Sequence, residues 1–301
     1  MGLFDRSAGV QVAVTPAVVS PRKPVQATIS IEKPITKVSA ATVEWGYTNF
    51  YRYHWAGRAD AAGAAGNDSL LTMDQVGTNY GSERDTDDWV GVTKVELPIA
   101  TGEFTGGSST FTVPSWAPAS SPVLARWSCR LTMRRGGRDV DTRGDFTVVI
   151  GPDDLQVENA ALQQVSGSDD TDLDIALPSP IYRAGDTVNG QITLTPHSDL
   201  PDGEVGVYWQ RHRDSHPLTR SPAAAALLAG RPVHLGKGIP LRAGTPVVLP
   251  FSLPLPHDAA PTASAVHSSL RWSIEARMFY KGFTSHLTER VRRPIVVVNA
   301  P

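Results

Sequence analysis

The chain has 301 residues, of which 41% are hydrophobic and 19% are charged, and its formal net charge is −2. This composition argues against a disordered chain, and the near-neutral charge gives no general attraction to nucleic acid or to an anionic membrane. The one cysteine, Cys129, excludes an intrachain disulfide. Because the length exceeds what one hydrophobic core usually serves, we expect two domains.

The N-terminal residues contain no apolar run long enough for a signal peptide. No stretch of the chain approaches the ~18 consecutive apolar residues of a membrane-spanning helix. We therefore expect a cytoplasmic protein without integral membrane association.

Apolar and polar residues alternate through residues 25–32 and 42–48, which is the period of a strand with one buried face. After the second of these strands, residues 56–88 have no counterpart in the second half, so we interpret them as an insertion. The middle of the insertion is rich in Ala and Gly, which is typical of a flexible loop.

Aromatic residues gather at the base of this insertion, and they could form a recognition surface. The candidate partner-binding residues there are Phe50, Tyr51, Tyr53 and Trp55. One alternative is that they continue a strand into the core. Another is that the aromatic segment 47–55 is a sugar-binding platform, which would make the chain a carbohydrate-binding β-sandwich protein.

The phrase "RWSCRLTM" at residues 126–133 returns as "RWSIEARM" at residues 271–278. In both copies the alternation places the tryptophan, Trp127 or Trp272, on the apolar side, so we predict two equivalent core anchors.

On the polar side of the first copy stand Arg126, Arg130 and Arg134, here called the arginine row. Guanidinium groups in a row can bind carboxylate or phosphate. We predict that the row receives an acidic protein partner or docks on the acidic segment 153–174. The alternative is a solvated charged face.

Three other segments of the second half have weaker signals. His212 and His216 are four residues apart but leave a strand for a loop, so we expect no metal site there. The acidic residues 166–174 lack the Asp-x-Asp-x-Asp-Gly order of a calcium loop, so we expect a solvated segment there. Residues 221–230, "SPAAAALLAG", have the start and stop signals of one short helix.

The repeat extends on both sides of the shared phrase, and Pro and Gly separate many short alternating segments. The sequence therefore predicts an all-β chain with two tandem immunoglobulin-like antiparallel β-sandwiches. We place the N-terminal sandwich at residues 8–152, the interdomain segment at 153–174 and the C-terminal sandwich at 175–301.

Two stretches of the second half resemble strands of the arrestin-like family. They are "YRAGDTVNGQITL" (182–194) and "SSLRWSIEARMFYKG" (268–282). The order of these elements in both halves resembles that family, including its bacterial branch related to sporulation-control proteins. The resemblance implies non-catalytic adaptors in which two sandwiches hold a partner on their faces or loops.

No P-loop, nucleophile elbow or dinucleotide fingerprint follows a strand, so we expect neither an enzyme nor a cofactor. The leading hypothesis is a cytoplasmic adaptor or scaffold that binds a protein and no nucleic acid, with bacterial signalling or development as its candidate setting. A hydrolase with an unrecognised site is the third alternative. The sequence leaves the partner's identity and the oligomeric state open.

Overall fold

The computed structural model describes residues 9–55, 82–155, 163–167, 169–280 and 288–300. Its contacts divide the chain into two compact units. Unit 1 consists of Met1–Val149, Asp214–Ala224 and Ser264–Ser269, and unit 2 consists of Ile150–Arg213, Ala225–Ala263 and Leu270–Pro301. Each unit is described below by itself.

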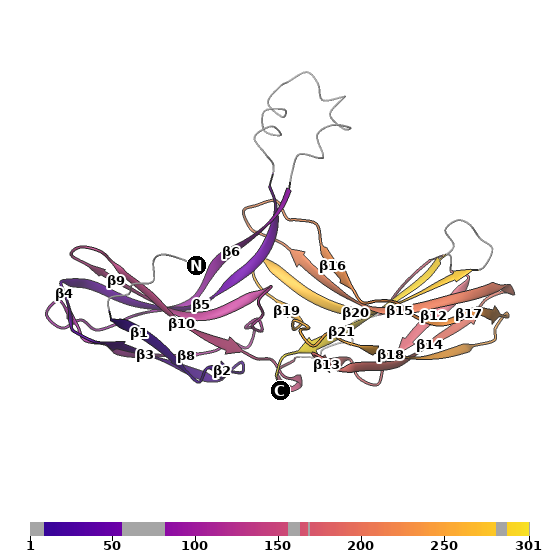
Figure 1. The fold of residues 1–301 in the computed structure, drawn as a ribbon, viewed down its shortest axis with the longest axis horizontal. Coiled ribbons are helices and arrows are strands. Elements are labelled where there is room, and N and C mark those ends of the chain that lie inside the picture. The colour runs from indigo at the N-terminus through magenta and orange to yellow at the C-terminus, as the bar shows by residue number, and fades with distance from the viewer. Residues whose placement is uncertain (1–8, 56–81, 156–162, 168, 281–287, 301) are drawn as a thin grey trace, which may run out of the picture. The chain divides into compact units, whose positions relative to one another are not determined.

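The strands of the first half are β1 (Val10–Thr15), β2 (Val18–Val19), β3 (Pro24–Ile31), β4 (Ile35–Thr36), β5 (Val38–Trp55), β6 (Ser82–Glu96), β7 (Glu103–Phe104), β8 (Gly107–Thr112), β9 (Ala125–Arg135) and β10 (Val140–Val148). They form a three-stranded sheet in the order β1-β3-β8 and a five-stranded sheet in the order β2-β10-β9-β5-β6, beside the small pair β4-β7. Within unit 1 the first sheet lies under the second (Figure 1).

The core of unit 1 lies between these two sheets. Trp45 of β5 stacks on Phe111 of β8 with ring centroids 5.3 Å apart, and its indole Nε1 donates to Ser109 Oγ at 3.0 Å. Trp127 of β9 contacts Phe146 of β10 and is 0% exposed. The indole Nε1 of Trp127 also has a hydrogen-bond partner, because it donates to the Pro118 carbonyl at 2.8 Å.

The strands of the second half are β11 (Gln164–Ser166), β12 (Thr171–Ala176), β13 (Ile181–Arg183), β14 (Thr187–Pro196), β15 (Leu200–Ser215), β16 (Ala226–Ala229), β17 (Val233–Leu241), β18 (Val247–Pro254), β19 (Ala263–Ser264), β20 (Ser268–Tyr280) and β21 (Thr288–Val298). One sheet has the order β12-β14-β18, and the larger one has the order β11-β21-β20-β15-β16. In the larger sheet, β13 pairs with β21, β17 with β15, and β19 with β20.

The core of unit 2 has the same plan. Trp272 of β20 is 2% exposed, and its Nε1 donates to the Ala260 carbonyl at 2.9 Å. Its ring contacts Trp209 of β15 with centroids 5.3 Å apart. Ile192 of β14 and Val207 of β15 are also fully buried. The prediction that the two repeated tryptophans are core anchors is therefore confirmed.

The two units also share a strand order. In unit 1 the central strand of the small sheet is β3, between β1 and β8, and in unit 2 it is β14, between β12 and β18. The antiparallel pair β9-β10 corresponds to β20-β21. In each unit one short strand, β2 or β13, adds in parallel to the last long strand. The internal repeat in the sequence is thus a repeat of topology.

The structure differs from the sequence-based expectations in three segments. The predicted helix at 221–230 is wrong: Ala226–Ala229 are strand β16, because their backbone pairs with residues 210–213 of β15. The segment 153–174 is not only a connector, since β11 and the start of β12 are strands of unit 2. Of the predicted insertion, residues 82–88 belong to β6, and residues 56–81 lie outside the described part of the chain.

Unit 1 includes two segments from the second half of the sequence, and both lie along the end of β5. Beyond Asn49, where β9 ends its pairing, the backbone of β5 bonds to residues 215–222 instead: His54 N donates to the Ser221 carbonyl at 2.9 Å. Asn49, fully buried, accepts a bond from His267 N at 2.7 Å and donates to Ser268 Oγ at 2.9 Å. The N-terminal domain expected from the sequence, residues 8–152, therefore lacks these two segments of unit 1.

No helix in the described part of the chain is long and apolar enough to span a membrane. Helical structure there is confined to the single 3-10 turn at Pro152–Asp154.

Candidate functional site

The arginine row lies on the solvent side of β9. Its members alternate with Trp127, Cys129 and Leu131, which are buried in the core of unit 1. Arg126 and Arg134 are exposed, and Arg130 is half-buried.

Arg130 is already engaged within unit 1. Its guanidinium lies over the Trp89 ring, 3.6 Å from the centroid, and Nη2 donates to Thr48 Oγ1 at 3.5 Å. Burial lowers the pKa of Arg130, while the charges of Asp141 and Glu44 oppose this shift. Part of the positive charge of the row is thus balanced by carboxylates of the same sheet.

The four candidate aromatic residues do not form one exposed platform. Tyr51 is buried, Phe50 and Tyr53 are half-buried, and Trp55 is 37% exposed, with the Arg84 guanidinium 3.9 Å from its ring centroid. Tyr51, Tyr53 and Trp55 lie on one face of β5 and Phe50 lies on the other. Of the three that share a face, only Trp55 is exposed, so they offer no flat exposed surface to a ligand. The geometry thus gives no support to the sugar platform on segment 47–55.

Tyr51 belongs to a polar cluster inside unit 1. Its hydroxyl donates a short hydrogen bond to Asp88 Oδ2, and its ring lies 4.9 Å from the His267 ring. Burial, together with the hydrogen bond and charge of Asp88, raises the pKa of Tyr51 to about 12. The role of Tyr51 is therefore to hold β5, β6 and residues 264–269 together, and it is not available as a contact surface.

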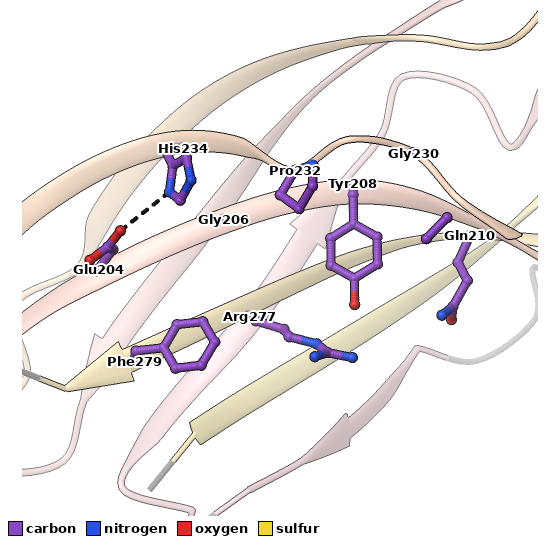
Figure 2. Close-up of a pocket in the computed structure, with 10 residues that line it drawn as sticks. Glu204, Gly206, Tyr208, Gln210, Gly230, Pro232, His234, Arg277 and Phe279 are labelled. Atoms are coloured by element: carbon purple, nitrogen blue, oxygen red, sulfur yellow. Dashed lines mark ion pairs between the residues drawn. The ribbon is translucent and has the colours of Figure 1, made fainter. Parts of the chain in front are cut away.

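A pocket of about 420 Å³ lies on the solvent side of the larger sheet of unit 2. Figure 2 shows its lining, here called the outer pocket: Glu204, Gly206, Tyr208, Gln210, Ala229, Gly230, Pro232, His234, Arg277 and Phe279. Gly206 and Tyr208 alternate along β15 with Val205 and Val207, which are buried in the core. The outer pocket is therefore on the opposite face of the sheet from the hydrophobic core.

A break in the edge of the sheet makes room for the outer pocket. β16 pairs with residues 210–213 of β15, and β17 pairs with residues 200–207. Gly230 N still donates to the Trp209 carbonyl at 2.9 Å, but residues 231–232 belong to neither pairing. Pro232 has no N–H with which to extend the ladder. Pro232 then forms one wall, above Tyr208 and Gly206 (Figure 2).

Two glycines have opposite roles beside this break. A Cβ atom on Gly230 would lie 2.5 Å from Trp209 Nε1, so only glycine allows Trp209 to pack there. Among the described residues, a Cβ on Gly206 would come no closer than 4.0 Å to a non-neighbouring atom, the nearest being the Val233 carbonyl oxygen. The space above Gly206 is thus the open floor of the outer pocket.

The polar end of the outer pocket adjoins a buried carboxylate. Glu275 is 0% exposed although it lies on the outer face of β20. Arg277 Nε donates to its Oε1 at 2.8 Å, Arg290 Nε lies 3.2 Å from the same oxygen, and Arg292 Nη2 donates to Oε2 at 3.1 Å. The Tyr208 hydroxyl also donates a short bond to Oε1.

This network holds Glu275 ionised. Burial opposes ionisation, but the hydrogen bonds from Tyr208, Arg277 and Arg292 and the charge of Arg290 together lower the pKa of Glu275. Burial, with the hydrogen bond and charge of Glu275, raises the pKa of Tyr208 to about 12. Three guanidinium groups around one carboxylate leave an excess of positive charge in this cluster.

Arg277 connects the network to the outer pocket. Its side chain is 37% exposed, and its guanidinium lies 5.5 Å from the centroid of the Tyr208 ring. Its hydrogen bond within the described residues is made by Nε, which leaves the two terminal nitrogens without a hydrogen-bond partner there. At the other end of the outer pocket, His234 Nδ1 and Glu204 Oε1 are 3.2 Å apart (Figure 2).

The sequence reasoning missed the outer pocket. Two signals were present: Gly206 interrupts an apolar strand, and Glu275 replaces the outward arginine found at Arg130 of the first copy. Neither signal shows that residues 231–232 leave the sheet above Gly206. That arrangement depends on the pairing of β16 and β17 with β15, which local sequence does not specify.

Two segments of the second half have weak metal signals in their sequences, residues 211–216 and 166–174. His212 Nε2 lies 2.9 Å from Gln210 Oε1, and His216 Nε2 lies 3.2 Å from the Ala265 carbonyl oxygen. Across the described ranges, the structure brings together no group of three or more His, Cys, Asp or Glu side chains suited to a metal ion.

No protein-family model matches the chain, and no curated protein matches it. Among solved structures, the chain is similar to the sporulation control protein Spo0M from Bacillus subtilis. The match covers 44% of this chain and 50% of that protein, at 13% sequence identity and a TM-score of 0.37. At this identity and TM-score the likeness carries no argument about family or function.

Proposed function

We propose that the chain is a non-catalytic cytoplasmic adaptor, built from two tandem arrestin-like β-sandwiches, that binds a protein partner through the outer pocket of unit 2. The observation that supports this most is a preformed hollow on the solvent face of a sheet. Its volume, about 420 Å³, is within the range of known ligand pockets. Its walls are apolar, and one end has an oriented guanidinium group, which suits recognition.

The lining of the outer pocket suits binding better than catalysis. None of the ten described residues that line it is Ser, Thr or Cys, so the described lining offers no hydroxyl or thiol nucleophile of the kind that acyl transfer uses. Tyr208 donates to Glu275 and has a raised pKa, so it stays protonated at neutral pH. His234 pairs with Glu204. Tyr208 and His234 therefore contribute to the shape and charge of the outer pocket.

An exposed aromatic residue at the rim of the outer pocket also favours a docking role. Phe279 is 47% exposed at the rim of the outer pocket. An exposed phenylalanine beside a hollow provides the apolar contact area that protein interfaces use at their centres. Partner binding would bury this ring.

Site-specific photocrosslinking tests the proposal. The photoreactive residue p-benzoylphenylalanine replaces Phe279 in the full chain, which is expressed in cells of the source organism. The control position is Val248 of β18, which is 52% exposed on the other sheet of unit 2. A second version carries Gly206→Val, which fills the floor of the outer pocket.

We expect a discrete protein adduct from position 279 that is absent from position 248 and is lost with Gly206→Val. An adduct that forms equally well in the filled variant would contradict docking in the outer pocket. If no protein adduct forms at position 279 under conditions in which the chain is folded, the adaptor proposal fails at this site.

A further inference from the structure

We infer that the outer pocket recognises a peptide carboxylate, an Asp or Glu side chain of the partner that stands next to an apolar side chain. The inference rests on the proposed function, because it assigns the chemistry of the group that docks. It follows from three features: the free edge of Arg277, the excess of positive charge around it and the apolar floor beside it.

Arg277 offers an oriented donor pair. Its Nε is fixed by Glu275 at 2.8 Å, and its guanidinium is held against the Tyr208 ring. A planar guanidinium held at one edge presents its two terminal nitrogens in a fixed fork, which matches the two oxygens of a carboxylate. Because Glu275 has already ordered this side chain, a ligand need not immobilise it on binding.

The charge around Arg277 favours an acid over an amide. Arg277, Arg290 and Arg292 surround the single carboxylate of Glu275. A second carboxylate at the outer edge of Arg277 would therefore meet positive potential. At the far end of the outer pocket, Glu204 lies near His234 and Lys237, so its negative charge is balanced there.

The floor of the outer pocket accepts the neighbouring apolar side chain. No side chain of the described residues lies within 4 Å of a Cβ placed on Gly206, and Pro232 and Phe279 border this space. Phe279 stands two residues beyond Arg277 on β20, so both side chains point to the outer face. A ligand with an acidic and an apolar side chain next to each other could contact Arg277 and this floor at once.

Peptide selection followed by a double-mutant cycle tests this inference. Dodecapeptides are selected from a random display library on the immobilised full chain. Selected peptides that contain an acidic residue are then synthesised in matched pairs, with Glu or Gln at that position. Their dissociation constants are measured for the wild type, Arg277→Gln and Gly206→Val. Arg242→Gln is the control, because it removes the same charge from an exposed turn of unit 2 outside the outer pocket.

For the wild type, we expect the Glu peptide to bind about tenfold or more tightly than the Gln peptide, as charge-assisted hydrogen bonds allow. In Arg277→Gln this preference should disappear, because the two changes remove the same interaction. Gly206→Val should weaken both peptides, and Arg242→Gln should change neither. Arg277→Lys should keep part of the preference, since it retains the charge and loses the planar fork.

Three results would overturn the inference: selected peptides without acidic residues, a Glu preference that survives Arg277→Gln, or peptides that bind Gly206→Val as well as the wild type. Urea unfolding of each variant shows whether unit 2 is intact, and Arg277→Lys decides the outcome if Arg277→Gln unfolds. A partner adduct at position 279 without any Arg277-dependent acid preference would reject this chemistry and leave the proposed function standing. An Arg277-dependent acid preference without a protein adduct at position 279 would reject the proposed function and leave this chemistry standing.

Discussion

Trp127 and Trp272 show how one residue secures each unit. Each ring is buried between two sheets, and each indole nitrogen donates to a carbonyl in the loop that precedes its strand, at 2.8 Å from the Pro118 oxygen and 2.9 Å from the Ala260 oxygen. The side chain thus fixes both the sandwich interior and the path of that loop. This dual contact explains why the phrase recurs with its tryptophan in place.

We predict that Trp127→Ala and Trp272→Ala each lower the free energy of unfolding by about 3–5 kcal/mol, as truncation of a buried aromatic residue does. Trp→Phe at the same positions should cost less, because it keeps most of the ring and loses the hydrogen bond. Urea denaturation measures both. A loss below ~1 kcal/mol for either alanine variant would contradict its place as a core anchor.

Glu275 gives unit 2 a stability that depends on pH. Its pKa in the folded protein is lowered from the ordinary value of 4.5, so its ionised form stabilises the fold above that pH. This contribution should fall away as the pH drops below 4.5 toward the folded pKa. We predict that Glu275→Gln costs about 1.5–3 kcal/mol at neutral pH, the range for hydrogen bonds to charged groups.

The measurement is urea unfolding of the wild type and Glu275→Gln from pH 7 to pH 3. The difference in the free energy of unfolding between the wild type and Glu275→Gln should shrink as the pH falls. Glu204→Gln is the matched control, because Glu204 is 40% exposed and should give a small difference. A Glu275→Gln penalty that is constant across this pH range would contradict the ionised network.

Two glycines near the break in the sheet make opposite predictions. Gly206→Val should leave stability nearly unchanged, because its Cβ enters open space in a strand that suits β-branched residues. Gly230→Val should destabilise by about 1–3 kcal/mol, because it overpacks the site against Trp209. Thermal unfolding compares the two variants. Equal losses would show that Gly206 is not beside open space.

At the scale of elements, the alternation of side chains could be predicted well. The parity of β9 and β20 follows from the spacing of their apolar residues, and it placed Trp127, Trp272 and the arginine row on their observed faces. The predicted helix at 221–230 failed because its local start and stop signals were outweighed by backbone pairing with β15. Pairing between distant segments is not encoded in a local window.

The β5–β6 hairpin is the second element that sequence reasoning misjudged. Residues 82–88 have the composition of a polar loop, yet they pair with residues 49–55 of β5. Glu83 pairs with Arg52 and also accepts a bond from Ala224 N at 3.0 Å. The signal that could have shown this is the continued alternation of Tyr51 and Tyr53 along a single long strand.

We predict that replacing residues 58–86 by a short Gly/Ser bridge destabilises unit 1, since it removes five paired residues of β6 and the contacts of Glu83. Replacing only residues 58–80 keeps β6 complete, so it is the control and should cost less. The two thermal midpoints decide the question. Equal midpoints would show that the end of the hairpin does not contribute to stability.

At the scale of the whole molecule, the order of units along the chain could be predicted, and their exact membership could not. The repeat places one set of strands in each half, as observed. The assignment of Asp214–Ala224 and Ser264–Ser269 to unit 1 depends on contacts with Asn49 and the end of β5. The repeat predicts only the strands that the two halves have in common, and these two segments are not among those strands.

Fragments should reflect this unequal division. The fragment 1–149 lacks both segments, so the partners of Asn49 are missing. We predict that it unfolds at a lower urea concentration than the same residues do within the full chain. The difference between the urea midpoints of the fragment and the full chain should be smaller when both carry Asn49→Ala. This substitution removes from the full chain the contacts that the fragment has already lost. An unchanged midpoint for 1–149 would contradict the role of these segments.

The central claim is that the partner docks in the outer pocket of unit 2 and not on the arginine row of unit 1. Amide hydrogen exchange of the full chain, with and without the partner captured at position 279, tests this most directly. We predict that the partner slows exchange at residues 204–210, 230–234 and 277–279, which form the outer pocket. Slowed exchange confined to residues 126–134, with those segments unchanged, would contradict the claim.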